Sequence, residues 1–158
     1  MRVAAILVCA VFGLQAQTAP ALKLTGATAE RGTSASVLIS LVSAPGQPIL
    51  GLQWELLYPS PQLGAEQSSF VAATAPKQVG KMLQCAGQPV DAGTFSYRCI
   101  LAGGVAPIPN GPIAAVTFYV REGARTGPTT IRIVHAIGAP ARDPSVPFEP
   151  VQANILIK

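Results

Sequence analysis

The chain has 158 residues, which is room for one domain with a sizeable hydrophobic core. Hydrophobic residues make up 49% of it and charged residues only 11%, which excludes the intrinsically disordered class, poor in apolar residues and rich in charge. The formal net charge is +4, but the basic residues are scattered along the chain, so a nucleic-acid-binding surface is not indicated.

Residues 1–16 are predicted to be a signal peptide. Arg2 is followed by the apolar run Val3–Leu14, which has the length of a signal-peptide core and is shorter than the roughly 20 apolar residues of a membrane-spanning helix. Cleavage near Ala16 leaves residues 17–158 as the mature domain. We therefore expect a secreted, periplasmic or cell-surface protein with no membrane attachment after cleavage; a retained anchor is the alternative.

The mature chain alternates between short β-branched or aromatic runs and turns rich in Gly and Pro, which is typical of many short strands. Within the runs, apolar and polar residues alternate, so one face of each strand is expected to be buried. The runs predict eight strands, at Leu22–Glu30, Ala35–Val42, Leu50–Tyr58, Lys81–Ala86, Thr94–Leu101, Pro112–Val120, Thr129–Ala136 and Val151–Ile157. Eight or nine antiparallel strands and no strong helix indicate an all-β fold, a β-sandwich.

Two segments carry no clear pattern. In Gln62–Val79, Phe70 and Val71 could form the ninth strand, while Ala72–Val79 fits a loop and a helical turn equally well. Gly138–Pro150 is rich in proline and is expected to be an irregular loop. The sequence does not decide the secondary structure of Gln62–Val79.

The run Leu50–Tyr58 has the largest apolar face of the predicted strands. Leu52, Trp54 and Leu56 share this face, and most of the residues that alternate with the apolar ones are glycine or polar. A strand with such a face needs a second layer to cover it. Trp54, the only tryptophan, is therefore predicted to lie in the core.

Two cysteines, Cys85 and Cys99, remain once the leader with Cys9 is removed. An even number in an exported chain indicates a disulfide; two buried free thiols are the alternative, and a redox pair is less favoured because there is no C-x-x-C motif. The Asp91–Gly93 turn joins their strands into a hairpin, and pairing the two cysteines directly centres it on Ala92. Opposed side chains lie slightly too far apart for a disulfide, so the bridge requires a local squeeze or a non-hydrogen-bonded pair.

No catalytic or metal-binding pattern is visible in the sequence. His135, the only histidine, is predicted to share a strand face with Ile131 and Ile133 as an edge or barely buried residue, and no partner marks it as a general base. The acidic residues, mostly in predicted turns, are Glu30, Glu55, Glu66, Asp91, Glu122, Asp143 and Glu149. A calcium ion held by Asp91 or Asp143 has no motif to support it. We therefore expect a non-catalytic protein without a cofactor or a metal site.

Three blocks resemble segments of the cohesin-like family of exported bacterial β-sandwiches. Glu30–Leu41 is similar to the family's glycine turn and second strand, and Leu50–Leu63 to its G-x-x-(aromatic)-x-L-x-Y-(D)-P-x-x-L segment. Asn110–Val120 is similar to its G-x-(L/I)-A-x-(V/I)-x-F-x-V block. The segments Gly80–Cys85 and Tyr97–Gly104 resemble cysteine-containing hairpins of single-domain members. The blocks follow one another in the family's order over nearly the whole mature chain.

The resemblance implies a jelly-roll, cohesin-like topology and a binding face. Cohesins bind dockerin modules through one face of the sandwich, but no residue motif for that face carries over to this sequence. One feature departs from the family pattern: Ser60 stands between two prolines, and no acidic residue lies beside Pro59, where family members often carry Asp. Any role of that acid is therefore absent.

The predicted function is protein–protein interaction by an exported binding module, through a face or an edge of the sandwich. The expected partner is an extracellular or cell-surface protein, such as a dockerin-like one. The alternative is a polysaccharide-binding module, which needs exposed aromatic rings. Tyr58, Tyr97 and Tyr119 are the candidates, and Tyr119 is the best of them because its strand neighbours take the opposite face.

Overall fold

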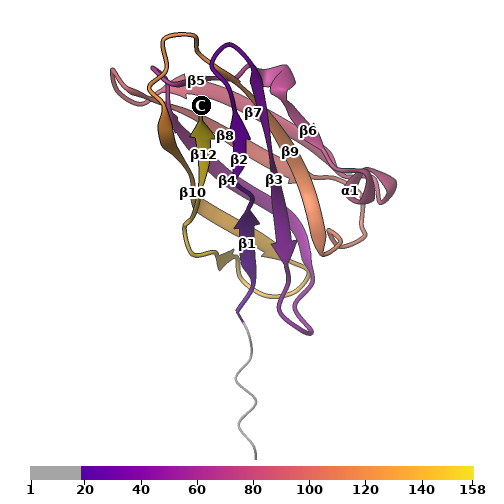
Figure 1. The fold of residues 1–158 in the computed structure, drawn as a ribbon. Coiled ribbons are helices and arrows are strands. Elements are labelled where there is room, and N and C mark those ends of the chain that lie inside the picture. Colours follow the sequence, from indigo (N-terminus) through magenta and orange to yellow (C-terminus); the bar gives the residue numbers. More distant parts are fainter. Residues whose placement is uncertain (1–18) are drawn as a thin grey trace, which may run out of the picture.

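The computed structural model describes residues 19–158, so the predicted signal peptide lies outside the described residues. Figure 1 shows two β-sheets stacked on one another, and the predicted all-β sandwich is confirmed. In the described part of the chain, no helix is long and apolar enough to cross a membrane.

Twelve strands between residues 19 and 158 form the two sheets. The smaller sheet, in the order β1-β3-β9-β5 with β6 also paired to β9, contains β1 (Ala21–Leu24), β3 (Ser34–Val42), β9 (Gly111–Val120), β5 (Leu63–Gly64) and β6 (Phe70–Ala72). The larger sheet, in the order β2-β12-β10-β4-β8-β7 with β11 also paired to β10, contains β2 (Ala27–Ala29), β12 (Val151–Ile157), β10 (Gly127–Pro140), β4 (Ile49–Pro59), β8 (Thr94–Ala102), β7 (Met82–Pro89) and β11 (Val146–Pro147). Among these strands only β2 and β12 pair in parallel.

The first predicted strand, Leu22–Glu30, is two strands in different sheets. β1 pairs with β3 in the smaller sheet, whereas β2 pairs with β12 in the larger one. The chain crosses between the sheets at Gly26, where a Cβ atom would lie 2.8 Å from the main-chain oxygen of Asn154. Glycine therefore permits the close approach to β12 that the crossing requires.

The other predicted strands are all present. The undecided segment contains β5, the 3-10 helix η1 (Gln67–Ser69), β6 and the short helix α1 (Thr74–Gln78). The expectation of an irregular loop at Gly138–Pro150 is only partly right, because β10 continues to Pro140 and β11 pairs with it. These additional strands are two or three residues long, too short to show an alternating pattern.

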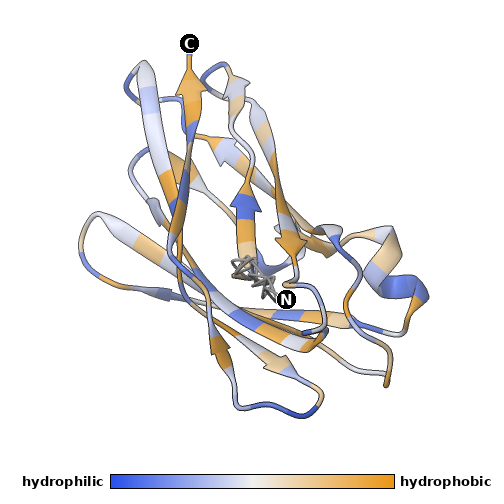
Figure 2. Ribbon diagram, turned by 90° about the horizontal axis from the view of Figure 1, so that it is seen from below, coloured by the Kyte–Doolittle hydropathy of each residue, from blue (hydrophilic) through white to orange (hydrophobic). Residues whose placement is uncertain are grey.

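The core lies between the two sheets. Trp54 of β4, Phe118 of β9 and Ile131 of β10 are fully buried there, as the alternation predicts for Trp54. Figure 2 shows hydrophobic and hydrophilic residues alternating along the strands. Burying one large apolar side chain contributes about 1.5–3 kcal/mol, so this shared layer holds the sheets together.

The hairpin of β7 and β8 carries the predicted disulfide. Cys85 lies directly opposite Cys99 and is bonded to it. Their Cα atoms are 4.1 Å apart, close to the about 4.5 Å of a non-hydrogen-bonded antiparallel pair. The disulfide therefore joins two residues whose backbones lie unusually close together, as a bridge between directly opposed strand residues requires.

Candidate protein-binding face

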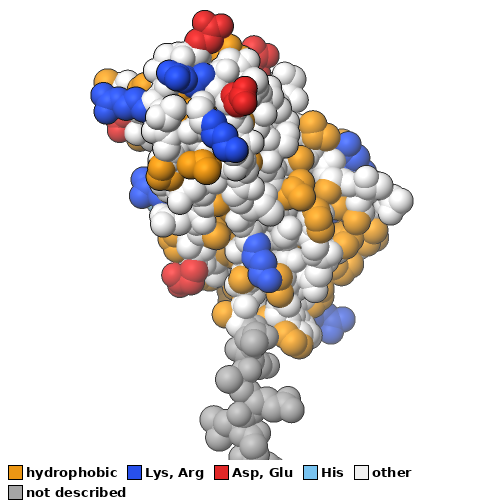
Figure 3. All heavy atoms as spheres, viewed as in Figure 1, with side chains coloured by type: hydrophobic (Ala, Val, Ile, Leu, Met, Phe, Trp, Pro, Cys, Tyr) orange, Lys and Arg blue, Asp and Glu red, His pale blue; other side chains and the backbone are white. Residues whose placement is uncertain are grey.

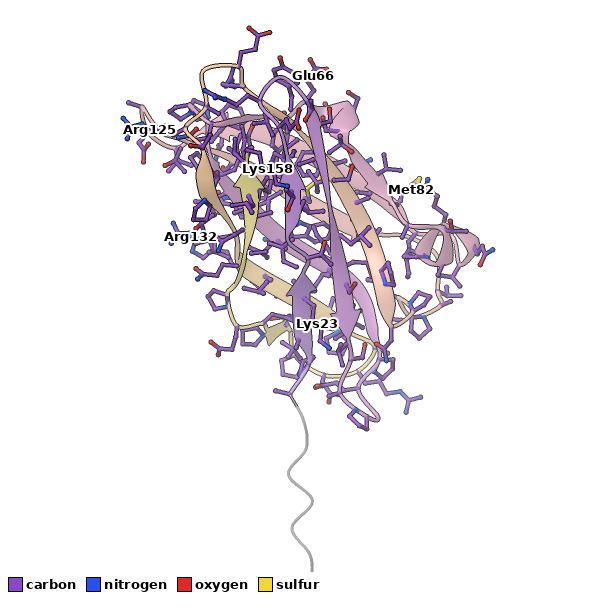
Figure 4. All side chains as sticks on the ribbon, in the orientation of Figure 1. Lys23, Glu66, Met82, Arg125, Arg132 and Lys158 are labelled. Carbon is purple, nitrogen blue, oxygen red and sulfur yellow. A yellow bond between two sulfur atoms is a disulfide. The ribbon has the colours of Figure 1, made fainter. Side chains whose placement is uncertain are left out.

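Four neighbouring strands of the larger sheet, β10, β4, β8 and β7, turn one side away from the core. We call the outward side chains of these strands the large-sheet face. The strand register arranges them in three rows: Ile137, Gln53, Ile100 and Gln84; then Val134, Glu55, Arg98 and Ala86; then Arg132, Leu57, Ser96 and Gln88. In Figure 4, Met82 of β7 and Arg132 of β10 lie on opposite sides of the molecule, which shows the width of this sheet.

Apolar side chains on this face remain open to solvent. Ile100 is 47% exposed and Ile137 is 42% exposed, and the two stand in the same row on either side of Gln53. Leu57 and Val134 are half-buried. Exposed apolar groups gathered on one face are typical of an interaction surface.

A β-bulge in β10 brings the only histidine onto this face. Val134 pairs with Glu55 and Ile137 with Gln53, so three steps along β10 match two along β4. His135 lies within the bulge with a φ of 51°, in the left-handed region that non-glycine residues seldom adopt.

The prediction that His135 shares a face with the buried Ile131 and Ile133 is therefore wrong. The bulge interrupts the alternation, and the exposed imidazole reaches a side chain of the outward rows. Regular alternation gave no sign of the extra residue.

Glu55 occupies the middle of the face and is only 8% exposed. His135 donates through Nδ1 to Glu55 Oε2 over 3.0 Å, and Arg98 Nη2 lies 3.9 Å from the same oxygen. The pKa of Glu55 lies below its usual 4.5, chiefly because of the hydrogen bond from His135, with a smaller contribution from the charge of Arg98 and against the opposing effect of desolvation. The face therefore carries a fixed carboxylate, bordered by two groups that can donate further hydrogen bonds to a partner.

The sequence pattern did not single out Glu55. Six of the seven acidic residues lie outside the strands, whereas Glu55 lies inside β4, the most apolar strand. The only available signal was its position between Trp54 and Leu56, where alternation points a charged side chain outward.

The cluster lacks a reachable nucleophile. Ser96 lies in the row next to Glu55, but it is fully buried and its hydroxyl has no hydrogen-bond partner among residues 19–158. Over the same residues, no group of three or more His, Cys, Asp or Glu side chains is placed to hold a metal ion. What the arrangement offers chemically is a set of directed hydrogen bonds and charges within an apolar surface.

The other residues singled out by sequence lie away from this face. Asp91 lies in the β7–β8 turn and accepts a hydrogen bond from the Gly93 amide over 2.8 Å. Tyr58 and Tyr97 are buried in the core. Tyr119, the predicted ring platform, is 44% exposed on the outer side of the smaller sheet. Figure 3 views the molecule from that side.

No protein-family model matches the sequence, and a search of curated proteins finds no match. Solved structures do resemble it. The sixth cohesin of scaffoldin B from Acetivibrio cellulolyticus, solved in complex with a Cel5 dockerin mutant, has a TM-score of 0.69 at 14% identity, over 89% of this chain and 100% of that one.

Two further cohesins show the same likeness. A type I cohesin from Clostridium thermocellum, solved in complex with a dockerin, has a TM-score of 0.69 at 15% identity over 89% of this chain and 100% of that one. A non-cellulosomal cohesin from the archaeon Archaeoglobus fulgidus has a TM-score of 0.66 at 13% identity, over 89% and 92% of the two chains. The chain thus has the fold of cohesin modules, as the sequence blocks imply.

Proposed function

We propose that this chain, whose fold is that of cohesin modules, is an exported, non-catalytic module that binds a dockerin-like protein through its large-sheet face. Two of the similar structures described above were solved with a dockerin bound. At such low identity to this chain, these structures indicate its fold alone. The location of the binding face is therefore argued from the residues of this chain.

The observation that carries the proposal is the composition of the large-sheet face. Ile100 and Ile137 provide exposed apolar area, and Glu55, Arg98 and His135 form a polar cluster beside them. Protein interfaces combine an apolar centre with directed polar contacts at its border. Arg residues are also frequent among the positions that contribute most of the binding energy.

The smaller sheet offers less room for a partner. Only β3 and β9 are long there, since β1, β5 and β6 have at most four residues each. The middle of its outer side carries the hydroxyl groups of Ser36 and Thr117, bonded over 3.0 Å, beside the exposed Leu38 and Val71. The larger sheet has four long neighbouring strands and is therefore the more suitable surface for docking a protein.

Export is part of the proposal. The bridge between Cys85 and Cys99 supports an oxidising compartment, because disulfides persist outside the cytosol. N-terminal sequencing of the protein recovered from its native host would test this. Mature protein beginning close to residue 17 is the expected result, and protein that still begins at Met1 would contradict export by cleavage.

Titration calorimetry against a panel of purified dockerin modules tests the binding itself. We expect at least one dockerin to bind, and Ile100→Asp to lower its affinity about tenfold or more, because the new charge is buried in the interface. Leu38→Asp is the matched control, since Leu38 is 41% exposed on the smaller sheet. Failure of every dockerin to bind would contradict the partner class, and equal losses in the two variants would contradict the face.

A further inference from the structure

A second site lies on the opposite side of the sandwich. We propose that a hollow around Tyr119 binds a neutral sugar, one or two residues long, independently of the large-sheet face. The hollow has a volume of about 470 Å³, and its functional lining is Ser34, Glu66, Ser69, Thr117, Tyr119 and Arg121. This volume lies within the range of about 300–1,000 Å³ that small-molecule sites occupy. We call it the Tyr119 hollow.

Small cross-strand neighbours create the hollow. Tyr119 of β9 lies opposite Ser34 of β3 on one side and opposite Gly64 of β5 on the other. Neither neighbour has a side chain large enough to cover the ring, so Tyr119 stays 44% exposed. The adjacent Phe118 and Val120 are fully buried and hold the strand, and with it the ring, in place.

Arg121 provides a positioned donor beside the ring. Its Nε donates to the main-chain oxygen of Ser60 over 2.6 Å, which anchors the guanidinium. One terminal nitrogen lies 3.6 Å from the place that a Cβ atom on Gly64 would take. In the part of the chain that the structure describes, the terminal nitrogens of Arg121 make no hydrogen bond, so they can donate to a ligand oxygen.

Acceptors and hydroxyl groups complete the lining. Glu66 is exposed at the border of the hollow, and Figure 4 shows it near one end of the molecule. The hydroxyl of Ser69 accepts a hydrogen bond from the Glu66 amide over 3.0 Å, which leaves its own proton free to donate. Ser34 and Thr117 add two exposed hydroxyls next to the ring.

A sugar matches this combination of groups. One face of a pyranose ring carries C–H groups that pack on an aromatic ring, while its edge carries hydroxyls that both donate and accept. The charges of Glu66 and Arg121 cancel, so the hollow has no net attraction for an acidic or a basic ligand. A single aromatic platform limits the contact to one or two sugar units.

Nuclear magnetic resonance titration of the mature domain, residues 17–158, tests the proposal. Cellobiose, maltose, lactose and xylobiose are the neutral probes, and glucuronic acid is the charged comparison. We expect at least one neutral sugar to shift the amide signals of Thr117, Tyr119 and Arg121. Tyr119→Ala should remove the shifts, whereas Tyr119→Phe, which keeps the ring, should retain them.

Two control variants separate this site from the other face. Leu38→Ala, on the same side but outside the hollow, and Ile100→Asp, on the large-sheet face, should both leave sugar binding unchanged. Absence of shifts with every neutral sugar would overturn the proposal, as would shifts that persist in Tyr119→Ala or binding of glucuronic acid alone. Because Ile100→Asp is expected to lose the protein partner and keep the sugar, the two proposals fail separately.

Discussion

Lys81 is a buried amino group whose partners are main-chain oxygens. It is only 2% exposed, and its Nζ donates to Leu50 over 2.9 Å and to Gly103 over 2.5 Å. Burial lowers the pKa of Lys81, because the charged form is poorly solvated there. The amino group joins the start of β4 to the loop after β8.

Lys81→Met should therefore destabilise the domain. The variant keeps the apolar stem but loses the buried amino group and its two hydrogen bonds to the carbonyls of Leu50 and Gly103, at a cost of about 1–3 kcal/mol. Urea unfolding measures the difference. Lys77→Met, at an exposed position of α1, should change stability by less than about 0.5 kcal/mol, and equal effects of the two variants would contradict this role of Lys81.

Glu55 should make stability depend on pH. Its pKa is lower in the folded protein than the usual 4.5, chiefly because His135 donates to it. A carboxyl group with a depressed folded-state pKa stabilises the fold above its unfolded-state pKa and loses that effect as pH falls through the folded-state value. Glu55→Gln should thus be less stable than the wild type at neutral pH, with a gap that narrows below about pH 4.5.

Unfolding midpoints measured from pH 7 to pH 3 check this expectation. A difference between Glu55→Gln and the wild type that stays constant over the whole range would show that the charge of Glu55 does not contribute.

The β7–β8 hairpin depends on a residue without a side chain. Gly87 of β7 faces Tyr97 of β8, and a Cβ atom at Gly87 would lie 2.8 Å from ring atoms of both Tyr97 and Phe95. Tyr97 in turn packs against Phe70 of β6, with ring centroids 4.5 Å apart. The rings cannot move aside without disturbing the contact between the sheets.

Gly87→Ala should therefore destabilise the domain by about 1–3 kcal/mol through overpacking. Gly123→Ala is the control, because a Cβ atom there meets no atom within 4 Å. Thermal unfolding of both variants checks the prediction, and a Gly87→Ala variant as stable as the control would show that the aromatic rings adjust freely.

Strands with a regular alternation were predictable from the sequence, and those that depend on distant pairing were not. The alternation in β3, β4 and β9 marks both their positions and their buried faces. The division of the first predicted strand at Gly26 depends on the backbone of β12, which is far away along the chain. The bulge at His135 likewise depends on the register with β4.

The same division applies to the candidate site. The exposed ring of Tyr119 follows from alternation, since its neighbours Phe118 and Val120 face the core. The cluster of Glu55, Arg98 and His135 does not, because it joins three strands whose register no local pattern specifies. Cross-strand sites of this kind become visible only when the sheet order is known.

At the scale of the whole molecule, the two sheets present different surfaces. The larger sheet offers a broad face in which a row with two exposed isoleucines lies beside a charged cluster. On the smaller sheet, Figure 3 shows charged side chains gathered mostly toward one end of the molecule. The two proposed sites lie on the outer sides of different sheets, so occupation of one does not cover the other.

Methyl-selective nuclear magnetic resonance of the domain, titrated with a dockerin that binds it, tests the location of the binding face most directly. The side-chain methyl signals of Ile100 and Ile137 should shift or broaden on binding, while those of Leu38, on the opposite side, should stay in place. Shifts at Leu38 with unchanged signals at Ile100 and Ile137 would contradict the large-sheet face as the site of protein binding.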